Sequence, residues 1–135
     1  NGHVGKGSRF YPSMGYFLDQ RFGDEQLVFG FAFHEGEYTA IGDRGLNVYG
    51  TTASEPGSVE WFLRASGMPR FILDLRSASS EEKGSRWLLA ELDFRSIGAM
   101  AIEYAFAPRK VKDDFDILVY FDESSPTDCF GFTGR

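Results

Sequence analysis

The stretch Leu27-Val28-Phe29-Gly30-Phe31-Ala32-Phe33 decides the fold that we expect for this chain. Large side chains alternate with small ones, so the bulky residues point to one side of a strand and the small ones to the other. We expect both faces to be buried, because the bulky face can fill a core layer while Gly30 lets a helix backbone come close on the small face. The polar residues His34-Glu35-Gly36-Glu37 would then form a turn, and residues 38–41 would return as an antiparallel partner.

Other apolar runs predict further strands. The predicted strands cover residues 27–33, 71–75 and 116–121, and a shorter extended piece is expected at 46–52 after a loop at 42–45. Residues 95–98 indicate a short strand or a tight connection. For residues 100–106 a helix and a strand remain open, and Asp113-Asp114 predicts a solvated turn.

Capping residues predict three helices between these strands. Ser13 can cap a helix that Gly23 ends, and Ser58 can cap a second helix that closes at Gly67. A third helix is expected from residue 79 or 80 to about residue 90. Strand and helix patterns therefore alternate with short connections, which is typical of an α/β fold with a partly parallel, mixed sheet flanked by helices.

The length of the chain fits one domain. Its 135 residues are 42% hydrophobic and include 14 Phe, which is enough to bury a substantial core. No linker divides residues 1–135. Because the chain starts at Asn1 without a methionine, we expect either a processed chain or a piece of a longer one.

Charge and cysteine content exclude some classes of protein. The net charge is −6 and no stripe of Lys or Arg appears, which argues against partners such as nucleic acid or an anionic membrane. No apolar run approaches the roughly 20 residues that span a bilayer, and no signal peptide opens the chain. Cys129 is the sole cysteine and cannot form an internal disulfide, so we expect a cytoplasmic protein.

Polar residues follow the predicted strands and mark a candidate crevice. In an open α/β sheet, ligands bind outside the carboxyl ends of the strands. Those ends carry the candidate substrate-binding or site-supporting residues His34, Glu35, Asp74, Arg76 and Asp122. The alternative is that these polar residues only mark where each strand leaves the core.

Asp74 is the most informative of these residues. It interrupts an apolar strand, and a carboxylate that is buried there needs a partner. Arg76 on the same face can supply one, as can Arg70 or Arg95 from a neighbouring segment. Such a pair is compatible with a purely structural role.

Several kinds of active site are poorly supported. No His-x-x-x-His or Cys-x-x-Cys spacing indicates a metal, no Gly-x-Ser-x-Gly indicates a serine nucleophile, and no glycine-rich fingerprint indicates a phosphate cofactor. We therefore expect neither metal nor cofactor. His3 remains, beside Asn1 in the opening loop, and a neutral imidazole can take a proton from water near pH 7. The residues thus point to hydrolysis by an activated water, with an exposed surface histidine as the alternative.

A series of short motifs resembles the erythromycin esterase family in order and spacing. The matching segments are Asn1-Gly2-His3-Val4, Ser13-Met14-Gly15, Arg21-Phe22-Gly23-Asp24, Gly30-Phe31-Ala32-Phe33, Pro56-Gly57-Ser58-Val59-Glu60, Leu73-Asp74-Leu75-Arg76, Arg95-Ser96-Ile97-Gly98 and Phe115-Asp116-Ile117-Leu118. The resemblance spans residues 1 to about 127 and corresponds to the last third of the family's chain. It implies that residues 1–135 form either a single α/β domain or the carboxyl-terminal part of a larger, hydrolase-like α/β domain.

The resemblance implies a metal-independent hydrolase of macrolide lactones, an activity tied to antibiotic resistance. His3 matches the second histidine of the family's His-Asn-x-His segment, and Asn1 matches its asparagine. The other catalytic His and Glu residues would belong to a missing amino-terminal half, so the piece alone should be inactive. A second hypothesis is a noncatalytic binding or assembly module, since some relatives were linked to polysaccharide biosynthesis. The residues before Asn1 would separate the two.

Overall fold

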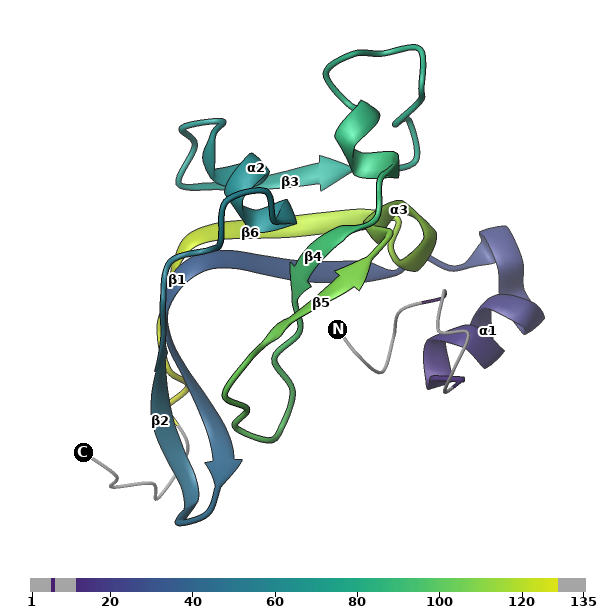
Figure 1. Ribbon diagram of the computed structural model, residues 1–135. Coiled ribbons are helices and arrows are strands. Elements are labelled where there is room, and N and C mark those ends of the chain that lie inside the picture. Colours follow the sequence, from purple (N-terminus) through teal and green to yellow (C-terminus); the bar gives the residue numbers. More distant parts are fainter. Residues whose placement is uncertain (1–5, 7–11, 129–135) are drawn as a thin grey trace.

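β1 (Phe29–Gly42) is the central strand of the molecule and joins two kinds of pairing. The computed structural model describes Lys6 and residues 12–128. Four strands form the main sheet in the order β2 (Gly45–Thr51), β1, β6 (Ile117–Ser124) and β3 (Arg70–Asp74), as Figure 1 shows. β1 and β6 are parallel, whereas β2 and β3 run antiparallel to their neighbours. The mixed sheet with one parallel pair confirms the predicted α/β class.

A second layer packs against one face of this sheet. It contains the two-stranded sheet of β4 (Leu92–Arg95) and β5 (Phe106–Arg109), with short helices around it. The helical segments are α1 (Met14–Phe22), η1 (Gly23–Glu25), α2 (Val59–Arg64), η2 (Arg86–Leu89) and α3 (Val111–Asp114). The core between the layers includes Val59 and Leu63 of α2, Phe94 of β4, and Leu118 and Tyr120 of β6.

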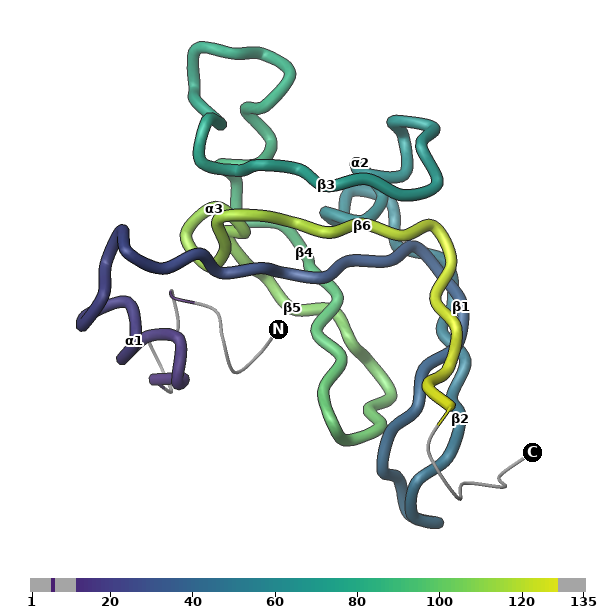
Figure 2. The backbone as a smooth tube through the Cα atoms, turned by 180° about the vertical axis from the view of Figure 1, so that it is seen from behind, coloured from purple at the N-terminus to yellow at the C-terminus, as the bar shows by residue number. Residues whose placement is uncertain are grey.

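The turn predicted at residues 34–37 is wrong, because β1 continues through it. The strand leaves its partner β6 at Gly36, which is opposite Ser124, and goes on as the partner of β2 (Figure 2). Gly36 has φ +123, and a Cβ there would meet the backbone oxygen of Ser124. The glycine therefore lets one strand bend between two partners. The actual hairpin turn is Asp43-Arg44, within the predicted loop, and β2 confirms the predicted extended piece.

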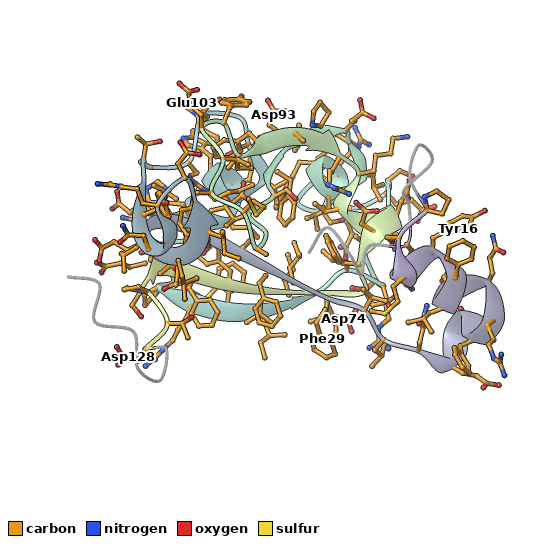
Figure 3. All side chains as sticks on the ribbon, turned by 90° about the horizontal axis from the view of Figure 1, so that it is seen from below. Tyr16, Phe29, Asp74, Asp93, Glu103 and Asp128 are labelled. Carbon is orange, nitrogen blue, oxygen red and sulfur yellow. The ribbon has the colours of Figure 1, made fainter. Side chains whose placement is uncertain are left out.

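The prediction that both faces of the opening strand are buried is also wrong. Val28, Gly30 and Ala32 face the core, but Phe29 and Phe31 are exposed. In Figure 3, Phe29 points away from the layer that carries Asp93 of β4. Nor does a helix backbone approach the small face, since the side chains of Leu118 and Phe115 lie nearest the position of a Cβ at Gly30.

The capping predictions are confirmed for two helices. The hydroxyl of Ser13 accepts a hydrogen bond from the N–H of Tyr16, and that of Ser58 from the N–H of Trp61. Gly23 ends α1 with φ +49. Local hydrogen bonds of this kind depend only on neighbouring residues, which explains why the sequence predicts them.

Three other segments differ from or complete the predictions. The helix expected from about residue 79 to 90 is only the 3₁₀ turn η2, preceded by a loop that Ser85 and Arg86 tie together through hydrogen bonds to the carbonyl groups of Ser79 and Ser80. The pair Asp113-Asp114 belongs to α3 and is not a solvated turn, because Asp114 is buried and ion-paired with Arg109 over 3.0 Å. Residues 95–98 begin with the end of β4, and β5 starts at Phe106.

Candidate functional site

A buried polar cluster joins α2 and β4, close to the end of the parallel pairing between β1 and β6. Glu60 of α2 has no exposed surface, and Arg95 of β4 is 4% exposed. The backbone N–H of Arg95 donates a 2.8 Å hydrogen bond to Oε1 of Glu60. Burial raises the pKa of the Glu60 carboxyl to about 7, although the N–H of Arg95 favours the charged form. The side chain can therefore hold or release a proton near neutral pH.

The guanidinium of Arg95 joins three parts of the chain. Its Nη2 donates to the carbonyl of His34 over 3.0 Å and to that of Thr52 over 2.8 Å. The same group lies over the rings of Phe106 and Phe33, 4.6 and 5.2 Å from their centres. Burial lowers the pKa of Arg95, but an arginine this far above neutrality stays charged. Arg95 thus fixes β1, the segment after β2 and β4 in one arrangement.

The cluster also holds a histidine and a serine together. Nδ1 of His34 and Oγ of Ser54 share a hydrogen bond of 2.6 Å. Ser54 is buried, whereas His34 is half-buried. His34 is therefore fixed twice, by its carbonyl through Arg95 and by its ring through Ser54.

Asp122 lies at the same end of the sheet as His34. Its carboxylate accepts a 2.7 Å hydrogen bond from the hydroxyl of Tyr120 and pairs with Arg64 of α2 over 2.8 Å. Burial, reinforced by Asp122, raises the pKa of Tyr120. Glu35 is opposite Glu123 of β6 in the parallel register and is exposed. The structure therefore brings His34, Glu35 and Asp122 to one end of the paired strands β1 and β6.

Asp74 and Arg76 lie at the opposite end of the strands. The crevice formed by all three strand ends is not present, because β3 runs antiparallel and places Asp74 beside Ile117, where β6 begins. Asp74 is exposed, and of the three possible partners Arg76, Arg70 and Arg95 it pairs with Arg76, over 2.6 Å. The hydrogen bonds from Arg76 lower the pKa of Asp74 to about 2. Because both groups are solvated, the pair adds little to stability.

His3 and Asn1 lie outside the described residues. Lys6, three positions after His3 in the sequence, forms an ion pair with Asp116 over 2.8 Å at the beginning of β6. Asp116 also accepts a hydrogen bond of 2.8 Å from the backbone N–H of Val28. Lys6 is thus held at the same end of the sheet as Asp74.

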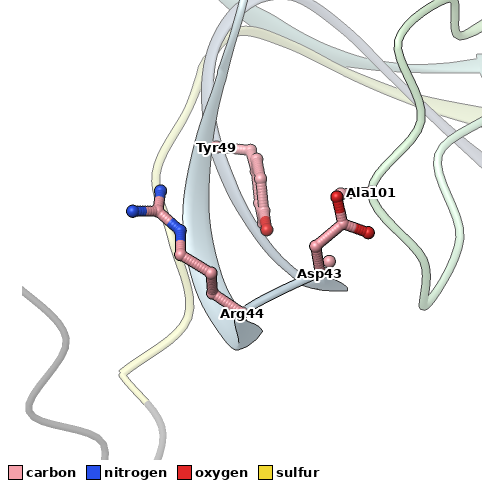
Figure 4. A pocket seen from close by; sticks show the side chains of 5 residues that line it. Asp43, Arg44, Tyr49 and Ala101 are labelled. Carbon is pink, nitrogen blue, oxygen red and sulfur yellow. The ribbon is translucent and has the colours of Figure 1, made fainter.

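Lys6 and residues 12–128 contain neither a metal site nor a membrane-spanning helix. In this part of the chain, no group of three or more His, Cys, Asp or Glu residues is arranged to hold a metal. None of its helices is both long and apolar enough to cross a bilayer. An open pocket lies at the β1–β2 hairpin, lined by Gly42, Asp43, Arg44, Tyr49 and Ala101 (Figure 4). Its lining contains no histidine and no predicted site residue.

The sequence interpretation missed Ser54, Glu60 and Arg95 as members of one cluster. Glu60 and Arg95 stand in two of the short motifs, Pro56-Gly57-Ser58-Val59-Glu60 and Arg95-Ser96-Ile97-Gly98, and this was the available signal. A charged residue directly after an apolar strand pattern or in the first turn of a helix is usually solvated, so its burial could not be anticipated.

These features define a mixed-sheet α/β domain with a buried, ionisable polar cluster at one end of its parallel pair. The family model described as Erythromycin esterase matches residues 1–124. The chain belongs to the erythromycin esterase family, which confirms the resemblance seen in the motifs.

Two solved structures are similar to the chain. A crystal structure of a Bacillus cereus protein matches with a TM-score of 0.83 and 25% identity, over 96% of this chain and 33% of that one. The crystal structure of a succinoglycan biosynthesis protein matches with a TM-score of 0.78 and 23% identity, over 91% and 31% of the two chains, and shows the same fold. The chain spans about a third of the length of these solved structures. No curated protein matches it.

Proposed function

We propose that this chain is the carboxyl-terminal part of an erythromycin-esterase-like, metal-independent hydrolase that cleaves ester or lactone bonds of macrolide-like substrates. Membership of the erythromycin esterase family over residues 1–124 carries the proposal. His3, in the motif that matches the family's His-Asn-x-His segment, is the proposed catalytic residue, and Asn1 supports it. The enzyme would act in the cytoplasm and would confer resistance to macrolide antibiotics.

The proposed step uses water as the nucleophile. The water oxygen forms a bond to the acyl carbon while the imidazole of His3 accepts one proton from it. The bond between the acyl carbon and the leaving oxygen then breaks, and the imidazolium returns the proton to that oxygen. The products are an acid and an alcohol, and neither a metal nor a cofactor takes part.

The remaining site residues form two separate groups in this proposal. His34, Glu35 and Asp122 lie at one end of the strands, and Asp74 and Arg76 lie at the other end. β6 separates the two ends by about 17 Å, from five residues at about 3.3 Å each. We expect only one group to contact the reacting bond, so Asp74→Asn and Asp122→Asn should differ in their effect on kcat/KM.

The test compares residues 1–135 with a longer chain that includes the preceding polypeptide. Each is incubated with a macrolide lactone and with simple esters, and ring opening is followed by mass spectrometry. The longer chain should turn over, His3→Ala should lower its kcat/KM by roughly 100-fold or more, and the surface variant Lys83→Ala should leave it unchanged. Residues 1–135 alone should be inactive. Full activity of His3→Ala would contradict the proposal, and His3-dependent turnover by residues 1–135 would show a self-contained site.

A second candidate is a noncatalytic binding or assembly module. The similar fold of a protein described as a succinoglycan biosynthesis protein favours it, as does the exposed phenylalanine face of β1. In that case the longer chain would bind a partner of polysaccharide assembly and would hydrolyse none of the esters, with or without His3.

A further inference from the structure

The main sheet has one apolar face that the described part of the chain leaves exposed. Residues in register across the three strands point to the same side, so Phe31 of β1, Val119 of β6 and Ile72 of β3 form one row. Phe29 and Phe121 extend this row along β1 and β6. Ile72 is 69% exposed, Phe29 43% and Phe121 41%. We call these five residues the open face.

The open face is opposite the core of the domain. The alternate residues of the same strands, which include Ala32, Leu118 and Tyr120, are buried against α2 and β4. In Figure 3 the side chain of Phe29 lies on the side of the sheet that carries no second layer. Large contiguous apolar surfaces seldom stay in water on a monomer, because burying them is favourable.

The strand pairing indicates what kind of structure covers it. All-parallel sheets occur almost only in α/β proteins whose two faces are both covered by helices, since the crossover connections between parallel strands place helices there. Here the pair β1 and β6 has short helices on the core side and none of the described helices on the other. The open face is bordered on β3 by the charged residues Arg70 and Asp74, so a covering helix needs an apolar stripe with polar residues at its margin.

We propose that the open face is the docking surface for an amphipathic helix from the remaining polypeptide of the longer protein. The chain is a third of the length of both similar solved structures, which leaves about two thirds of such a protein to supply the cover. This inference rests on the longer chain assumed in the proposed function, but it concerns assembly and not catalysis. A second copy of the chain on the same face is the competing occupant.

Cysteine labelling tests the proposal in folded protein. Ile72→Cys and Met68→Cys are each made in a Cys129→Ser background, and Met68 serves as control because it is 49% exposed and precedes β3 in a loop. In residues 1–135 both cysteines should react with a maleimide at similar rates. In the longer chain, the Met68→Cys variant should keep its labelling rate, whereas the Ile72→Cys variant should react at least about 100-fold more slowly, because buried sites react only on local opening.

A charge substitution gives an independent readout. Ile72→Asp should change the melting temperature of residues 1–135 by less than about 2 °C, but it should lower that of the longer chain by about 10 °C or prevent folding, since it buries an unpaired carboxylate. Met68→Asp should be neutral in both.

Two outcomes would overturn the inference. One is equal labelling of both cysteines in the longer chain, or the finding that no polypeptide precedes Asn1 in the full-length protein. The other is labelling at position 72 that slows with rising concentration of residues 1–135, which would assign the face to a second copy. Neither readout uses turnover, so an inactive but protected longer chain would contradict the hydrolase and support the docking surface.

Discussion

The backbone N–H of Arg95 donates a 2.8 Å hydrogen bond to Oε1 of Glu60, 35 positions earlier in the chain. Both side chains are buried, yet Oε2 of Glu60 and Nε of Arg95 have no hydrogen-bond partner among the described residues. A buried polar atom without a partner is costly, so this pair makes stability sensitive to protonation and to truncation.

The stability of the domain should depend on pH through Glu60. Its pKa rises from 4.5 to about 7 on folding, so the folded state binds the proton more tightly than the unfolded state. Its contribution is fully present below pH 4.5 and is lost as pH rises to about 7, a total of about 3 kcal/mol. Denaturant unfolding of the wild type and Glu60→Gln at several pH values between 4 and 8 measures it.

The difference between the two proteins isolates this group from other carboxyls. Glu60→Gln should gain on the wild type by about 3 kcal/mol between pH 4.5 and 7. The exposed control Glu81→Gln should follow the wild type at every pH. A constant difference between Glu60→Gln and the wild type would contradict the raised pKa.

Truncating Arg95 should destabilise the domain strongly. Arg95→Met keeps much of the packing against Phe33 and Phe106 but leaves the carbonyls of His34 and Thr52 unpaired. We expect a loss of about 3 kcal/mol in the free energy of unfolding. Chemical denaturation measures it, with the exposed Arg44→Met as control within about 0.5 kcal/mol.

The double variant Arg95→Met/Glu60→Gln tests whether the two side chains are coupled. In the double variant, Glu60→Gln removes the buried carboxylate that Arg95→Met would leave without a nearby cation. The loss in unfolding free energy should therefore be smaller than the sum of the two single losses, by about 1 kcal/mol. Strict additivity would show that the two side chains act independently.

Gly36→Ala should destabilise the bend in β1, whereas Gly50→Ala in β2 should be tolerated. Gly36 has φ +123, and an added Cβ would also lie 2.7 Å from the backbone nitrogen of Ser124. The expected loss is about 3 kcal/mol or more, from backbone strain and overpacking. Gly50 has nothing within 4 Å of a Cβ. Thermal unfolding of both variants decides, and equal stabilities would contradict the assigned role of Gly36.

Ser54 should act as a structural partner of His34 and not as a nucleophile. It is buried and is held by Nδ1 of His34 at 2.6 Å. Ser54→Ala should cost roughly 1 kcal/mol in unfolding free energy, and an organophosphate should not modify Ser54 in the folded protein. Mass spectrometry of the treated protein checks this, and a covalent adduct on Ser54 would restore a serine mechanism.

The sequence by itself determined the local structure and the family. The caps at Ser13 and Ser58 follow from short-range hydrogen bonds, and the strands near residues 71–75 and 116–121 follow from continuous apolar runs. The order of the short motifs identified the erythromycin esterase family, because the order and spacing of motifs can be read from the sequence without the folded structure.

Only the tertiary structure decided direction, burial and neighbours. The antiparallel course of β3 separates Asp74 from Asp122, and the length of β1 replaces a predicted turn with a bend at Gly36. Likewise, the burial of Glu60 by the second layer raises its pKa. Strand direction and burial arise from contacts between residues far apart in the chain, and these contacts leave no periodic trace in the residues that make them.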